Sequence, residues 1–234
     1  MTMTRLPHNY PRNICAYCGA TENLTDDHVP PRNLFPKPRP SYLITVPACT
    51  NCHSNTSKDD EYFRINLCLH EEAGDHPSAK ANWGSIFRSL KRAQAKGLKK
   101  QFIKDIHNVQ LRTASGLYLG NKVAYDVDLG RIRNVVERTI RGLYFAECSL
   151  PLGFDNEIEV YTNEDLELQN SDILDQLKRD IVNPLAAMTP KSIGDNVFLY
   201  RHQIIQEIPI LSVWIVSFYE KVPFLCMTGP MRSA

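Results

Sequence analysis

The chain has 234 residues, of which 43% are hydrophobic and 23% are charged, and this composition predicts a folded globular protein rather than a disordered one. The formal net charge of +1 excludes a uniformly basic nucleic-acid coat, so any phosphate-binding surface must be a local patch. No apolar run approaches the roughly 20 residues of a membrane-spanning helix, and the polar residues 1–13 do not resemble a signal peptide, so we expect a cytoplasmic protein.

The N-terminal elements are expected to be short. Residues 12–29 predict a cysteine turn followed by a short strand, with Gly19 where a tight turn needs a positive φ. Residues 30–47 contain six prolines, which excludes a central strand or a helix, although 42–46 can form a short edge strand. Residues 57–71 predict a helix with acidic side chains in its first turn.

A boundary between two units is expected at residues 74–82. Beyond it, apolar residues recur first at helical and then at strand spacing. The expected elements are a helix from Trp83 to Ile106, a hairpin at about 108–128, a helix at 131–147, a strand at 157–162, a helix at 171–182 and an antiparallel meander at 196–228.

Four of the seven cysteines form two C-x-x-C pairs, Cys15/Cys18 and Cys49/Cys52. In a reducing compartment this pattern favours a metal site over disulfides. Each pair presents two thiolates, so together they supply the four soft ligands of a tetrahedral zinc ion. Four thiolates leave no open position for a substrate, and we therefore expect a structural Zn²⁺ that fixes two distant segments.

A carboxylate and two histidines lie beside these cysteines. Asp27 and His28 lie between the two pairs, and His53 directly follows Cys52. A carboxylate next to one imidazole, with a second imidazole fixed by the zinc scaffold, can hold one hard divalent cation and leave one histidine free as a base.

This pattern resembles the HNH (His-Asn-His, ββα-metal) endonucleases. Their signature is C-x-x-C, then Asp-His at a strand end, then C-x-x-C followed at once by His or Asn at a helix start, and here it spans residues 12–72. The resemblance implies that His28 is the general base toward an attacking water and that Asp27 and His53 bind Mg²⁺ or Mn²⁺. It also implies products with a 3′-hydroxyl and a 5′-phosphate.

The predicted fold class is α+β. Residues 1–75 would form a zinc-stapled ββα-metal nuclease unit, and residues 80–234 an α+β accessory domain that ends in an antiparallel sheet. The accessory domain would set substrate choice, form a homodimer or dock a regulatory protein partner.

Three site assignments stay open. Adjacent strand residues point to opposite faces, so Asp26, which shares a face with His28, competes with Asp27 for the cation. Asn55 competes in the same way with His53. The asparagine that the family carries shortly before its second cysteine pair is absent from residues 41–45, and the candidates to replace it are Asn33, Ser41 or a backbone carbonyl.

Basic residues gather after Trp83, where they can hold a phosphate backbone without reading its sequence. An ordinary solvated helix face fits the same pattern equally well. The predicted nucleic-acid-binding residues are Arg88, Lys91, Arg92, Lys96, Lys99 and Lys100, with Lys104 beside them. For Arg131, Arg133, Arg138 and Arg141 we expect a solvated face.

The expected function is metal-dependent endonucleolytic cleavage of DNA, with RNA not excluded, and analogy suggests phage defence or a mobile-element role. Two other classes compete. A zinc-stapled nucleic-acid-binding module would need the cysteines and the basic helix, but not Asp27, His28 and His53 together. An interaction subunit with a decayed nuclease site would account for the missing asparagine.

Overall fold

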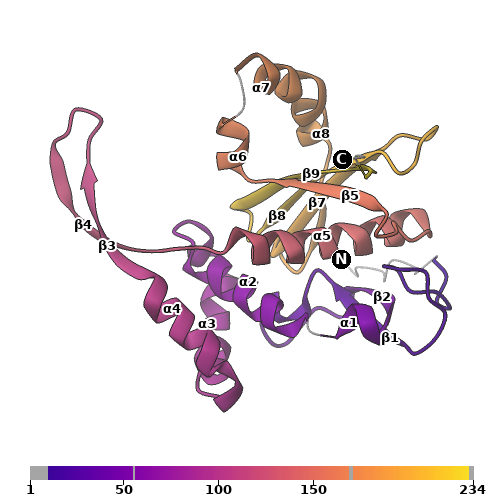
Figure 1. The fold of residues 1–234 in the computed structure, drawn as a ribbon, viewed down its shortest axis with the longest axis horizontal. Coiled ribbons are helices and arrows are strands. Elements are labelled where there is room, and N and C mark those ends of the chain that lie inside the picture. Colours follow the sequence, from indigo (N-terminus) through magenta and orange to yellow (C-terminus); the bar gives the residue numbers. More distant parts are fainter. Residues whose placement is uncertain (1–9, 55, 169–170, 232–234) are drawn as a thin grey trace.

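The computed structural model describes residues 10–54, 56–168 and 171–231. It confirms the α+β class, with an N-terminal ββα unit, a layer of helices and a five-stranded antiparallel sheet (Figure 1). None of the helices in these residues is long and apolar enough to cross a membrane.

The N-terminal unit is built on two short strands. They are β1 (Leu24–Val29) and β2 (Ile44–Cys49), and they are followed by the single-turn helix α1 (Thr50–His53) and by α2 (Ser57–Leu69). The strands pair antiparallel, with His28 opposite Thr45. Pro47 lies inside β2, contrary to the expected loop up to residue 47. This two-stranded sheet leaves each strand a free edge, where a missing N–H is tolerated.

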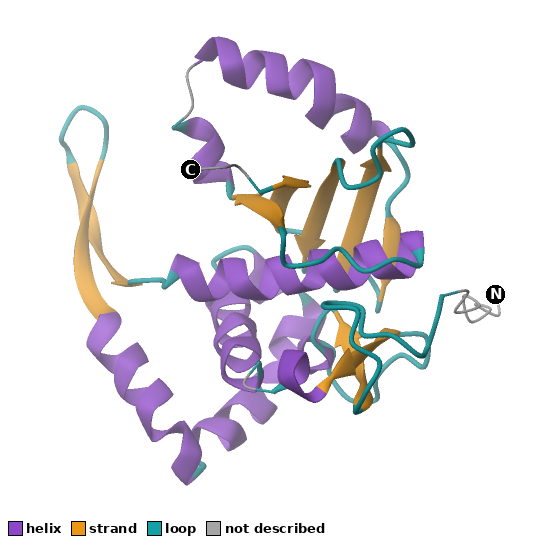
Figure 2. Cartoon of the chain, turned by 45° about the vertical axis from the view of Figure 1, so that its right-hand side comes forward, coloured by secondary structure: helices purple, strands orange, loops and turns teal. Residues whose placement is uncertain are grey.

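The single helix expected from Trp83 to Ile106 is wrong, because the chain turns near Arg92 (Figure 2). The segments are α3 (Pro77–Leu90), a 3₁₀ turn (Ala93–Ala95) and α4 (Lys96–Asp105). The turn returns the apolar face of α4 to the body, where Phe102 stacks on Tyr62 of α2 with ring centroids 5.3 Å apart. Apolar spacing alone does not distinguish one long helix from two short ones.

The other expected elements are present, with shifted ends. The hairpin is β3 (Ile106–Arg112) and β4 (Tyr118–Tyr125), and the long helix is α5 (Leu129–Cys148). The expected helix at 171–182 is divided into α7 (Ser171–Leu177), a π-helical turn (Lys178–Val182) and α8 (Asn183–Ala187), after the short α6 (Asn163–Glu167).

The C-terminal meander is confirmed. The large sheet has the order β5-β9-β8-β7-β6, with all neighbours antiparallel. Its strands are β5 (Asn156–Tyr161), β6 (Lys191–Ile193), β7 (Phe198–Ile204), β8 (Ser212–Phe218) and β9 (Val222–Pro230).

Helix α5 lies between the large sheet and the N-terminal layer, and one hydrophobic core runs through both (Figure 1). Phe63 of α2 packs edge-on against Phe218 of β8, with centroids 4.8 Å apart. The Leu34 carbonyl accepts hydrogen bonds from the amide of Asn82 and the hydroxyl of Tyr219, each at 2.7 Å. The division of the chain into units of residues 1–75 and 80–234 stays a prediction, because these two parts share one hydrophobic core.

Gly142 is a position of close packing between α5 and β1. A Cβ atom at this residue would lie 2.4 Å from Cγ2 of Val29 and 3.1 Å from Cγ1. Val29 ends β1, the strand that carries Asp27 and His28. The absent side chain at residue 142 thus sets the distance between the central helix and the predicted active-site strand.

We expect Gly142→Ala to lower the free energy of unfolding by about 1–3 kcal/mol, because overpacking outweighs the roughly 1 kcal/mol that alanine gains in a helix. The matched control is Gly84→Ala in α3, where a Cβ would lie 3.6 Å from its nearest neighbour, the side chain of Arg88. That variant should be as stable as the wild type or more stable. Urea denaturation measures both, and equal stabilities would contradict the role of Gly142.

Candidate active site and zinc centre

The four paired cysteines come together at one end of the β1–β2 unit. Their sulfur atoms all lie within 4.8 Å of one another, and Sγ of Cys18 is 3.6 Å from Sγ of Cys49. Sulfur ligands at about 2.3 Å from one tetrahedral zinc lie roughly 3.8 Å apart, so the cluster suits this ion. The N–H of Cys49 donates to Sγ of Cys15 at 3.3 Å, and Gly19, with φ +76°, closes the first turn.

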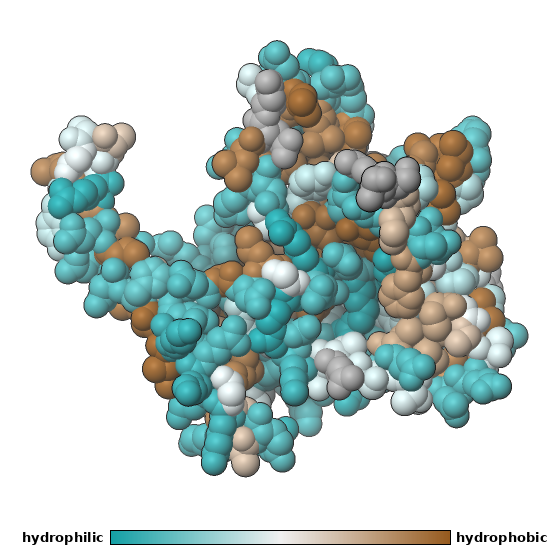
Figure 3. Space-filling view, in the orientation of Figure 1, coloured by the Kyte–Doolittle hydropathy of each residue, from teal (hydrophilic) through white to brown (hydrophobic). Residues whose placement is uncertain are grey.

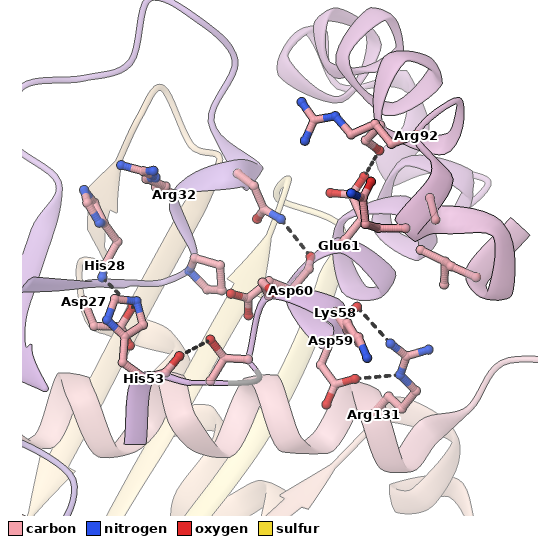
Figure 4. Close-up of a pocket in the computed structure, with 18 of the residues that line it drawn as sticks. Asp27, His28, Arg32, His53, Lys58, Asp59, Asp60, Glu61, Arg92 and Arg131 are labelled. Atoms are coloured by element: carbon pink, nitrogen blue, oxygen red, sulfur yellow. Dashed lines mark hydrogen bonds and ion pairs between the residues drawn. The ribbon is translucent and has the colours of Figure 1, made fainter. Parts of the chain in front are cut away.

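Asp27 is buried, and its two carboxylate oxygens have separate partners. The hydroxyl of Tyr17 donates to Oδ2 at 2.7 Å, and the N–H of His28 donates to Oδ1 at 2.9 Å. Nε2 of His53 lies 3.7 Å from the same Oδ1 (Figure 4). The Thr25 hydroxyl is 2.9 Å from the other ring nitrogen, Nδ1, and this contact keeps Nε2 directed toward Asp27.

The Asp27–His53 pair supplies two donor atoms that one divalent cation could use, a carboxylate oxygen and an imidazole nitrogen 3.7 Å apart. Neighbouring ligands of an octahedral Mg²⁺, each at about 2.1 Å, lie roughly 3 Å apart, so the two side chains would have to move closer to bind it. Asp26 does not share the geometry, because its side chain is 62% exposed and pairs with Arg12 at 3.2 Å. In the part of the chain that the structure describes, no third His, Cys, Asp or Glu completes a cluster here. Asn55, the alternative to His53, lies outside the described residues.

His28 is half-buried beside this pair, and in Figure 4 its ring points toward Arg32 and away from His53. Burial lowers the pKa of the His28 imidazole, and the positive charge of Arg32 lowers it further. The ring therefore remains neutral to a lower pH than a free histidine does. Neutral imidazole is the form that accepts a proton.

An open cleft of about 1140 Å³ runs from this pair to helices α3 and α4. β1, the loop after it, the first turn of α2 and the α3–α4 junction form its walls (Figure 4). The basic side chains that line it are Arg32, Arg39, Lys58, Arg92 and Arg131. Of the six predicted nucleic-acid-binding residues, only Arg92 lines the cleft, whereas the other five are exposed elsewhere on this helical segment.

Every other carboxylate of the cleft has an arginine partner. The pairs are Asp26 with Arg12, Asp59 with Arg131, Asp60 with Arg138, and Glu61 with Arg64. Burial raises the pKa of the Asp60 carboxyl to about 7, against the opposing charge of Arg138. Within the described ranges, no lysine or arginine pairs with Asp27, whose oxygens face only hydrogen-bond donors and an imidazole.

The arginines of α5 do not form the expected solvated face, because α5 is covered by protein on two sides. Arg131 and Arg138 pair with α2, and Arg133 pairs with Asp165 at 2.8 Å. Arg141 donates to the carbonyls of Leu152, Gly153 and Asn156.

Of the named substitutes for the missing asparagine, Asn33 lines the cleft and Ser41 is exposed outside it. The Asn33 amide donates to the Asp60 carbonyl at 3.0 Å, so α2 holds this side chain. The carbonyl opposite His28, that of Thr45, accepts from the side chains of Tyr10 and Arg12.

Sequence reasoning missed Tyr17 and Thr25. Thr25 lies two residues before Asp27 on β1, so strand alternation places both side chains on one face and could have identified it. Tyr17 lies between the cysteines of the first pair, and nothing in its local pattern indicates that it contacts Asp27.

Comparisons with family models, with curated proteins and with solved structures give no match for this chain. The resemblance to the HNH endonucleases therefore remains a prediction that rests on the motif.

We expect one tightly bound zinc per chain in the purified protein, measured by elemental analysis. Cys15→Ser or Cys49→Ser should prevent folding or lower the melting temperature strongly, because metal binding at such a site, about 10–16 kcal/mol in isolated zinc fingers, contributes directly to folding. Cys148→Ser is the control, since this half-buried thiol lies outside the cluster. Folded wild-type protein without zinc would contradict the assignment.

Proposed function

We propose that this chain is a metal-dependent endonuclease of the HNH type that hydrolyses phosphodiester bonds in DNA. The observation that carries the proposal is the Asp27–His53 pair, in which a buried carboxylate without a lysine or arginine partner among the described residues lies 3.7 Å from an imidazole nitrogen. A phosphate backbone would be repelled by such a carboxylate unless a cation lay between them. The carboxylate oxygen is the ligand type that Mg²⁺ and Mn²⁺ prefer, and a neutral imidazole nitrogen is a common metal ligand.

Asp27 and His53 would hold one Mg²⁺ or Mn²⁺, which neutralises charge on the phosphate and on the leaving 3′ oxygen. His28 takes a proton from a water molecule whose oxygen attacks the phosphorus. The new P–O bond forms while the bond to the 3′ oxygen breaks, and the leaving oxygen takes up a proton from solvent. The products are a 3′-hydroxyl and a 5′-phosphate. Tyr17 and Thr25 are positioning residues, because they act through Asp27 and His53.

In this proposal, zinc in the cysteine cluster is structural. Cys52 precedes His53 directly, and Cys49 ends β2 opposite Leu24 at the start of β1. A bound ion would therefore fix the two segments that carry the Asp27–His53 pair. A two-stranded sheet is marginally stable by itself, so this support has a physical reason.

One specific observation favours a second candidate, a zinc-stapled nucleic-acid-binding or interaction subunit with a decayed nuclease site. Among the described residues, no hydrogen bond holds the His28 ring: the Asn33 amide nitrogen donates to the Asp60 carbonyl, and the Thr45 carbonyl accepts from Tyr10 and Arg12. Oδ1 of Asn33, the atom that would accept from an imidazole N–H, is buried without a hydrogen-bond partner. The orientation of the base histidine by an asparagine therefore has no counterpart in these hydrogen bonds.

A plasmid assay with Mg²⁺, with Mn²⁺ and with no added divalent cation separates the two candidates. We expect His28→Ala to stay folded, keep its zinc and bind DNA, while cleavage falls about a hundred- to ten-thousand-fold. Asp27→Ala should lose cleavage through lost cation binding and regain part of it at high metal concentration.

Asp26→Ala is the matched control, because it removes the neighbouring carboxylate that is exposed and paired with Arg12. This variant should cleave within a few-fold of the wild-type rate. A folded His28→Ala protein that cleaves at the wild-type rate would remove the base assignment. A wild-type protein that binds DNA and cleaves nothing under any of these conditions would favour the second candidate.

DNA affinity should distinguish the cleft from the rest of the basic surface. Arg92 lines the cleft, whereas Lys99 lies about 200° around α4 from both Gly97 and Gln101, which do line it. Arg92→Glu should therefore weaken DNA binding and reduce the slope of affinity against salt concentration by the amount of about one phosphate contact. Lys99→Glu should have a smaller effect on both the affinity and the slope. Fluorescence anisotropy at several salt concentrations measures this, and equal effects would contradict binding in the cleft.

A further inference from the structure

The segment from Arg88 to Tyr125, which we call the arm, is far more basic than the rest of the chain. It contains nine Lys and Arg residues and one Asp, so its net charge is +8 while the whole chain carries +1. The arm consists of the end of α3, the 3₁₀ turn, α4 and the β3–β4 hairpin. The remaining residues together carry −7, so the positive charge of the chain is concentrated on the arm. Such a concentration of positive charge predicts a polyanionic partner.

The β3–β4 hairpin projects from the body at the end of this arm (Figures 1 and 3), and Lys122 of β4 pairs with Glu71, just after α2, at 3.0 Å. It belongs to no larger sheet, and most of its side chains are exposed on both faces. An isolated two-stranded hairpin is marginally stable in water. Such a ribbon is therefore expected to gain stability from a partner that contacts both of its strands.

One face of the ribbon is rich in amide side chains. Gln110 is paired with Asn121 and Asn108 with Val123, and Arg112, two residues after Gln110 on β3, shares this face. All five side chains are exposed, and Arg112 donates to Gln110 at 3.0 Å. In the described part of the chain, no hydrogen bond engages the side chains of Asn108 and Asn121.

These residue types are the ones that read base edges in the major groove of DNA. Asn and Gln pair with adenine through two hydrogen bonds, and Arg pairs with guanine in the same way. The major groove of B-form DNA, about 12 Å wide, admits a two-stranded β-ribbon, whereas the major groove of an RNA duplex is too deep and narrow. The face carries no carboxylate that would be repelled by phosphates.

The position of the ribbon fits a duplex held in the cleft. The start of α4 lines the cleft, and the ribbon begins directly after α4, whose ten residues span about 15 Å. The grooves of DNA repeat at about 34 Å, so a duplex with its backbone in the cleft presents a groove within reach of the ribbon.

We infer that the β3–β4 ribbon enters the major groove of duplex DNA and reads its sequence through Asn108, Gln110, Asn121 and Arg112. The inference rests on the proposed function in one respect, the location of the backbone in the cleft. It makes the substrate double-stranded DNA with a sequence preference, and it assigns sequence reading to an element outside the catalytic unit.

Selection from duplexes with a randomised central region tests this, with His28→Ala as the parent so that the DNA stays intact. The parent should enrich a sequence motif. Asn108→Ala, Gln110→Ala and Asn121→Ala combined should still bind with strong salt dependence but lose the preference, by about fivefold or more for each lost contact. Circular dichroism and zinc content check that the variants fold.

The matched control changes the opposite face of the ribbon. His107 and Lys122 lie on that face, since they are out of phase with Asn108 and Asn121. His107→Ala with Lys122→Ala should leave the motif unchanged and weaken binding to every sequence equally.

Four results would overturn the inference. They are no enriched motif, the same motif in the triple variant, tighter binding of an RNA duplex, or a dimer that Leu119→Glu and Val123→Glu dissociate without any effect on DNA binding. The last result would assign the ribbon to a second copy of the chain. If the parent enriches a motif but the wild-type protein cleaves no DNA, the proposed nuclease function is refuted and sequence reading by the ribbon stands. If DNA is cleaved at the same sequences with and without the three substitutions, sequence reading by the ribbon is refuted and the nuclease function stands.

Discussion

The packing of α5 on two sides at once is the constraint on which the arrangement of this protein depends. One side of the helix covers the five-stranded sheet, and the other contacts α2 and the β1–β2 unit. A helix of 20 residues that is buried in this way fixes the relative positions of elements that are far apart in the sequence. Gly142 sets the distance to β1, and Arg138 fixes the start of α2 through Asp60. The Asp27–His53 pair therefore depends on a helix that contributes no ligand to it.

The sequence predicted what local spacing determines. The C-x-x-C pairs, the Asp27–His28 step and the amphipathic α5 all carry their signal within a few residues, and the structure confirms the sulfur cluster and the helix. The turn between α3 and α4 has no such signal, because it depends on where Phe102 finds the ring of Tyr62. The contact between Tyr17 and Asp27 was likewise hidden, since it spans two segments whose approach is set by the cysteine cluster. The difference between Asp26, which is exposed and paired with Arg12, and Asp27, which lies beside His53, likewise depends on three-dimensional positions that the sequence pattern does not give.

The carboxylates of the cleft show how burial and charge select one residue for a distinct role. Four of them are held by arginines from α2, α5 and the N-terminal loop, so their charges are largely balanced within the protein. Asp26 and Arg12 form an exposed pair, whereas Asp59, Asp60 and Glu61 form pairs that are largely covered by protein. Breaking a covered pair leaves a charge without compensation, which is costly, and these three carboxylates are therefore poor candidates to exchange partners during a reaction. Asp27 differs, because its Oδ1 atom faces an imidazole nitrogen and a backbone N–H. It is the buried carboxylate of this cleft that has no arginine or lysine partner among the described residues.

The charge distribution extends this argument to the whole molecule. The net charge of +1 is the sum of +8 on the arm and −7 on the rest of the chain. Because the net charges of the two parts have opposite signs, electrostatic attraction of a polyanion would favour approaches in which the arm makes the first contact. Attraction of this kind acts over about 8–10 Å at physiological salt, and it therefore orients the partner before short-range contacts form. The cleft begins where the arm leaves the body, at the α3–α4 junction. In the proposed function, a phosphate backbone that followed the arm toward the body would reach Asp27, the carboxylate of the cleft that has no arginine or lysine partner in the described residues.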